Sequence, residues 1–128
     1  MKLEDQVASL ELCKRLKELG VKQESEFYWN CDTDHWTSEP CKDTRHWRLI
    51  NDDGNEREGY SAFTVAELGE MLPKEVRSGA LWWLEIVRSE AWRFKYGKII
   101  FTAGTGDTEA DARAKMLIHL IEKGIVMP

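Results

Sequence analysis

The sequence predicts an α+β protein in which an antiparallel sheet of about four to five strands is covered by about three helices. Helical periodicity with capping residues recurs at three separated places, whereas the segments between them are alternating or continuously apolar, as strands are. Short turns between the strands favour an antiparallel sheet over a doubly wound one. With 128 residues, of which 42% are hydrophobic, residues 1–128 are expected to form a single domain.

The first predicted helix is SLELCKRLKELG, residues 9–20. Ser9 is a suitable N-cap residue, and Gly20 is suited to end the helix. Cys13 is expected to be a small buried side chain rather than a reactive thiol. Leucines at i, i+4 and i+7 predict one apolar face, formed by Leu12, Leu16 and Leu19.

Two strands and a second helix follow. FYW at 27–29 and RHWRLI at 45–50 are rich in strand-forming residues, and Asp53-Gly54 is typical of a hairpin turn. The second helix lies in FTVAELGEMLP, residues 63–73, where Thr64 and Glu67 have the spacing of a capping box. Phe63 and Leu68 are placed for the accompanying hydrophobic staple, and Pro73 ends the helix.

Three further strands and a last helix complete the chain. ALWWLEIV, WRFKY and IIFTA, residues 80–87, 92–96 and 99–103, are predicted to form an antiparallel meander. AGTGDT at 103–108 is interpreted as a glycine turn that leads into the N-cap of the helix in 107–124. That helix has a stripe of Ala110, Ala114, Leu117 and Ile121, a stop at Gly124, and His119 on its polar face.

The expected order is therefore α-β-β-α-β-β-β-α. The continuous apolar run at 80–87 suggests a strand that is covered on both faces. Helix–sheet–helix layers are accordingly the expected arrangement.

The segment 31–46 offers the one candidate site, because Cys31, His35, Cys41 and His46 supply the side chains that zinc prefers. Their spacing, C-x3-H-x5-C-x4-H, lacks the close ligand pair of familiar structural zinc sites. A disulfide between Cys31 and Cys41 is a second interpretation. The third, which we favour, is an acidic loop with unpaired thiols, so that no metal or other cofactor is expected.

No catalytic residue is expected either. A reactive thiolate needs electropositive surroundings, whereas residues 31–58 contain eight acidic and four basic side chains, a net charge of −4. Trp36 lies in this polar segment and is the best single candidate for contact with a partner.

The overall charge narrows the classes of partner. The net charge is −5, and no basic patch stands out, which disfavours nucleic-acid binding. No apolar run reaches the roughly 20 residues of a membrane span, and the charged start of the chain does not have the pattern of a signal segment. A cytoplasmic protein is expected, and antiparallel edges would allow a homodimer.

The segments SAFTVAELGEMLP and DTEADARAKMLIHLIEKG resemble a group of small uncharacterised proteins of bacteria and prophages. The resemblance covers about residues 7–30 and 60–125 and departs from the group in the acidic segment 31–58. It implies a small α+β protein of mobile-element origin and implies no activity. A weaker similarity is to the phage-type alpha–beta–alpha sandwich domain.

These observations together predict a non-enzymatic, prophage-type accessory protein that binds a protein partner or associates with itself. The alternative is a small zinc-binding module that uses the cysteine and histidine cluster at 31–46. A third hypothesis, mimicry of nucleic acid by the acidic segment 31–58, is less favoured, because a net charge of −5 is modest for that role.

Overall fold

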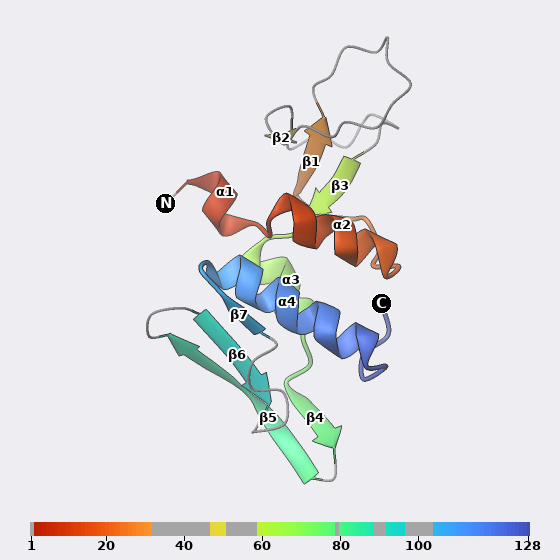
Figure 1. Ribbon diagram of the computed structural model, residues 1–128, viewed down its shortest axis with the longest axis vertical. Helices are drawn as coiled ribbons and strands as arrows, with labels where there is room; N and C mark the ends of the chain where they lie inside the picture. Colours follow the sequence, from red (N-terminus) through yellow and green to blue (C-terminus); the bar gives the residue numbers. More distant parts are fainter. Residues whose placement is uncertain (1, 32–46, 51–58, 79, 89–91, 97–103) are drawn as a thin grey trace.

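A computed structural model describes residues 2–31, 47–50, 59–78, 80–88, 92–96 and 104–128 (Figure 1). Within these ranges the helices are α1 (Leu3–Gln6), α2 (Leu10–Glu18), α3 (Val65–Met71) and α4 (Glu109–Glu122). The strands are β1 (Phe27–Cys31), β2 (Trp47–Ile50), β3 (Gly59–Ala62), β4 (Glu75–Ser78), β5 (Ala80–Arg88), β6 (Trp92–Tyr96) and β7 (Gly104–Gly106). The α+β class is confirmed.

The strands form two antiparallel sheets, with the orders β2-β1-β3 and β4-β5-β6-β7. The prediction of one sheet with four to five strands was therefore wrong. The predicted layers were also wrong, because α2, α3 and α4 lie between the two sheets instead of outside a single one (Figure 1). The periodicity of a strand shows that it has a buried face, but it does not show which sheet the strand joins.

The predicted meander is confirmed in part. β5 pairs with β6 in the register Leu84↔Tyr96, and β6 pairs with β7 in the register Phe94↔Gly104. The glycine segment expected to be a turn thus contributes an edge strand, and the predicted strand at 99–103 lies outside the described residues. α1, β3 and β4 are short elements that periodicity did not predict.

Both glycines predicted to end helices do so. At the end of α2, Gly20 has φ +94°, its N–H donates to Lys17 O, and the next N–H, of Val21, donates to Leu16 O, each at 3.0 Å. This pair of bonds is a Schellman motif, which requires a left-handed residue that glycine adopts without strain. Gly124, with φ +72°, ends α4 in the same way.

The capping box of α3 is also confirmed. Glu67 N–H donates to the Thr64 hydroxyl at 3.2 Å, and Thr64 N–H donates to Glu67 Oε1 at 2.9 Å. Phe63 and Leu68, the predicted staple, are both fully buried. The second oxygen of Glu67 accepts the N–H of Glu26 at 3.1 Å, so this cap also holds the segment that enters β1.

Thr108 caps α4, and its hydroxyl accepts the N–H of Asp111 at 3.1 Å. The carboxylate of Asp111 does not complete a capping box, because its Oδ1 accepts the N–H of Ser9 at 2.8 Å. Ser9 is the N-cap residue of α2 by position, but its side chain makes no capping hydrogen bond. Asp111 thereby joins the beginnings of α2 and α4.

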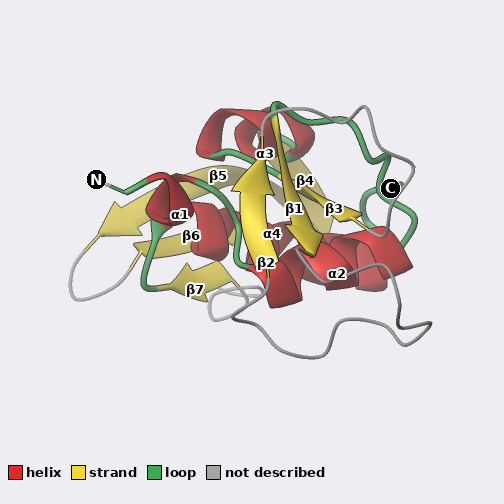
Figure 2. Cartoon of the chain, turned by 90° about the horizontal axis from the view of Figure 1, so that it is seen from above, coloured by secondary structure: helices red, strands yellow, loops and turns green. Residues whose placement is uncertain are grey.

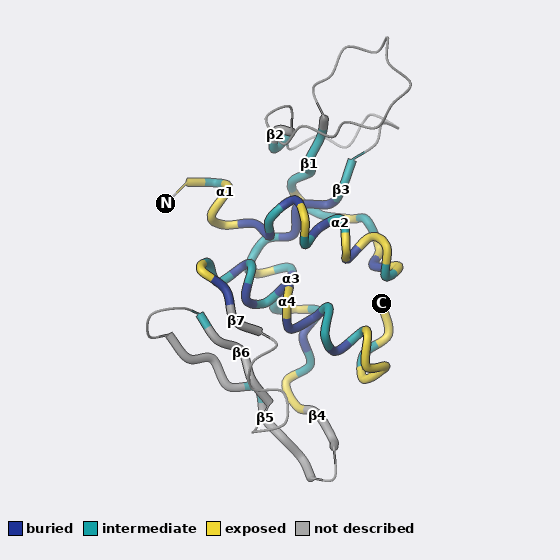
Figure 3. The backbone as a smooth tube through the Cα atoms, viewed as in Figure 1, coloured by how far each residue is buried: buried dark blue, intermediate teal, exposed yellow. Residues whose placement is uncertain are grey.

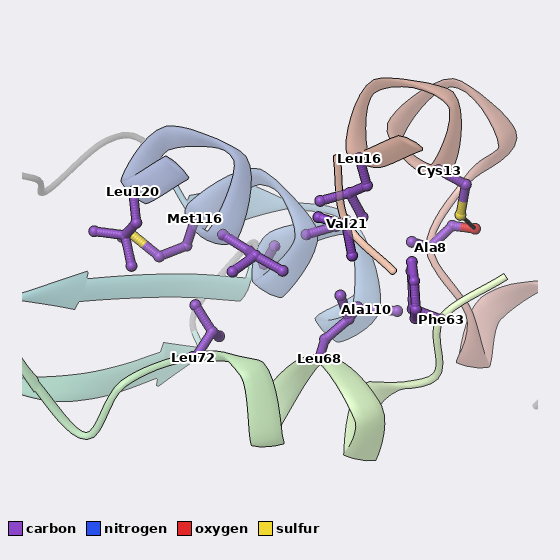
Figure 4. Close-up of a cluster of buried hydrophobic side chains, with 13 residues drawn as sticks. Ala8, Cys13, Leu16, Val21, Phe63, Leu68, Leu72, Ala110, Met116 and Leu120 are labelled. Atoms are coloured by element: carbon purple, nitrogen blue, oxygen red, sulfur yellow. Dashed lines mark hydrogen bonds between the residues drawn. The ribbon is translucent and has the colours of Figure 1, made fainter. Parts of the chain in front are cut away.

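The core surrounds α4, which is buried on several sides (Figure 3). Ala110, Ala114 and Leu117 of the predicted stripe are buried, and Ile121 packs at its edge. Ala112, Met116 and Leu120 are buried as well, because α4 contacts α2, α3, β6 and β7. Figure 4 shows the side chains of α2, α3 and α4 that meet in this cluster.

The buried face of α2 is rotated from the one expected. Leu10, Cys13 and Leu16 are buried, whereas Leu12 packs only partly against the core and Leu19 is half-buried. The leucine spacing alone marked the wrong boundary of the face, because the side chains buried with Leu16 are Leu10 and Cys13.

Gly106 provides a first test of this packing. A Cβ at this position would lie 2.7 Å from the backbone nitrogen of Ala112, so β7 approaches α4 more closely than alanine allows. We expect Gly106→Ala to lower the free energy of unfolding by about 1–3 kcal/mol, the range typical of overpacking. Chemical denaturation followed by circular dichroism measures this change.

The control is Ala66→Ser at an exposed position of α3, which should change stability by less than about 0.5 kcal/mol. If Gly106→Ala proved as stable as the wild type, the close approach of β7 and α4 would be refuted.

Candidate functional site

The three-stranded sheet lies at one end of the molecule, next to α2 (Figure 1). The two predicted strands form it as β1 and β2, paired in the register Tyr28↔Ile50 and Cys31↔Trp47. β3 pairs with the other edge of β1, where Tyr28 lies opposite Ser61. Figure 2 looks onto this end of the chain and shows β2, β1 and β3 side by side.

The two faces of this sheet have different environments. Trp29, Leu49 and Tyr60 share one row across the strands, and Trp29 and Tyr60 pack against the core. The alternate row contains Tyr28, Ile50 and Ser61 and therefore lies on the opposite, outer face. Tyr28 and Ile50 remain half-buried there, whereas Ser61 is fully buried.

Several polar contacts attach the inner face to the helices. The indole N–H of Trp29 donates to the carbonyl oxygen of Ala8 at 3.0 Å. The ammonium groups of Lys14 and Lys17 lie 5.8 and 5.1 Å from the centre of the Tyr60 ring. Cation–π contacts of this kind contribute about 0.5–1 kcal/mol at exposed sites. The inner face of the three-stranded sheet therefore packs on α2.

The outer edge of β3 is covered by the chain itself. Lys17 Nζ donates to Gly59 O at 3.2 Å, and Ser61 N–H donates to Gln23 Oε1 at 2.8 Å. Farther along, Ala8 N–H donates to Phe63 O at 2.9 Å. Three outward groups along this edge, Gly59 O, Ser61 N–H and Phe63 O, are therefore bonded by other segments of the chain.

The bond to Ser61 also fixes the directions of the other backbone groups. In an antiparallel sheet the N–H and C=O of one residue point to the same side, and the side alternates along the strand. Because Ser61 points away from β1, Tyr28 points toward β2 and bonds with Ile50, its partner in register. Leu49 must therefore direct its N–H and C=O away from β1, to the outer edge of β2.

The residues singled out as a metal site lie mostly outside the described part of the chain. This holds for His35, Cys41 and His46, and also for Trp36, the predicted partner contact. Cys31 ends β1 and is described by its backbone pairing alone. No cluster of metal-binding side chains occurs among the described residues.

Cys13 and His119 are described. Cys13 is fully buried as expected, and its thiol donates to the carbonyl oxygen of Ala8 at 3.4 Å (Figure 4). Burial raises the pKa of this thiol from 9.0 to about 12, and a backbone hydrogen bond with Phe63 opposes the rise only in part. His119, expected to be a solvated surface residue, is half-buried near the end of α4.

Sequence reasoning missed the residues that close the β3 edge. GYSA in β3 is too short to show a clear alternation, and Gln23 lies in a connection without periodicity. The only sequence signal for this strand is the run of small residues in GYSA, just before the capping box of α3. Their role depends on segments that are about 40 residues apart in sequence, Gln23 with Ser61 and Lys17 with Gly59.

No protein-family model, curated protein or solved structure matches the chain. Within the described ranges, no helix is both long enough and apolar enough to cross a membrane.

The buried thiol leads to a chemical prediction. With a pKa of about 12, roughly one Cys13 in ten thousand is a thiolate at pH 8. In a Cys31→Ser/Cys41→Ser background, we expect no iodoacetamide adduct on the native chain at pH 8 and one adduct in denaturant. Intact-mass spectrometry counts the adducts. Rapid alkylation of the native chain would contradict the burial of Cys13.

Proposed function

We propose that this chain is a non-enzymatic, prophage-type accessory protein of the cytoplasm that works by binding protein through the three-stranded sheet. The observation that carries the proposal is the asymmetry of that sheet. Its inner face and its β3 edge are bonded to the rest of the chain, whereas the outer row and the β2 edge face away from the described core.

The outer row has a composition suited to protein contact. Tyr28 and Ile50 are half-buried neighbours in adjacent strands, so an aromatic and a branched aliphatic side chain lie side by side. Such side chains supply contact area at a low cost in conformational entropy. Asn30, two residues after Tyr28 on the same face, has a buried side-chain oxygen.

The chemistry of the described residues supports binding over catalysis. The described thiol, Cys13, is protonated by burial and lies inside the core, where a substrate does not reach it. The carboxylates of Asp111 and Glu67 accept backbone N–H groups and so hold elements together. These side chains therefore stabilise the fold.

The prophage-type assignment rests on the two sequence segments quoted above.

A pair of matched variants tests the proposed surface. Ile50→Lys places a charge in the outer row, and Ala66→Lys makes the same change in charge at an exposed position of α3. We expect Ile50→Lys to weaken capture of a bacterial protein, or of the chain itself, by about tenfold, which equals about 1.4 kcal/mol. Tagged chains on beads and quantitative mass spectrometry of the bound proteins measure the effect.

Ala66→Lys should bind as the wild type does, and both variants should keep the wild-type melting temperature within a few degrees. Equal capture by the two variants, or retention of nucleic acid alone, would overturn the proposal.

The zinc-binding module remains the alternative, and one of its candidate ligands, Cys31, ends β1 opposite Trp47. In the sequence, His46 is the residue just before Trp47. The chain between them contains the other two candidates, His35 and Cys41. Four ligands from one connection could surround a tetrahedral ion.

Native mass spectrometry of the reduced protein, before and after a chelator, distinguishes the two functions. The zinc module predicts one zinc per chain that the chelator removes, together with a fall in melting temperature. Cys31→Ser combined with Cys41→Ser should abolish the metal. A metal-free mass, with an unchanged melting temperature in the double variant, would eliminate the zinc-binding function.

A further inference from the structure

We draw no further inference here: the strongest candidate, the apolar surface patch that Ile125 and Met127 expose just after the end of α4, carries no proposal because nothing in the structure shows what covers it.

Discussion

The close packing around α4 is the constraint on which the other elements depend. Its buried alanines, Ala110, Ala112 and Ala114, keep the helix narrow enough to lie between α2, α3 and β7 at once. Gly106 lets β7 approach the first turn of the helix. Asp111 in that turn accepts the N–H of Ser9 and so fixes where α2 begins relative to α4. One helix thereby positions elements from both ends of the chain.

The three-stranded sheet follows from this arrangement. α2 is fixed against α4, and the sheet is fixed against α2 by Trp29, Tyr60 and Lys17. The connection after α2 passes along β3, where Gln23 bonds to its edge. The contacts that attach the sheet therefore also bond three outward groups along its β3 edge.

The proposed binding function agrees with how the chain uses its reactive side chains. Cys13 is held as a protonated thiol within the core, and its carbonyl partner, Ala8 O, also accepts the indole of Trp29. The carboxylates of Glu67 and Asp111 are similarly engaged with backbone N–H groups of other segments. These hydrogen bonds join elements that are distant in sequence, and so they stabilise the fold.

The sequence by itself determined the features that depend on neighbouring residues. The capping box at Thr64, the helix stops at Gly20 and Gly124, the burial of Cys13 and the pairing propensity of β1 and β2 each follow from a few adjacent side chains. Only the tertiary structure decided how the strands divide into two sheets, that the helices lie between them, and that Asp111 bonds to Ser9 instead of completing its own cap. These outcomes depend on contacts between segments far apart in the chain, and local periodicity contains no information about which distant segment supplies the partner.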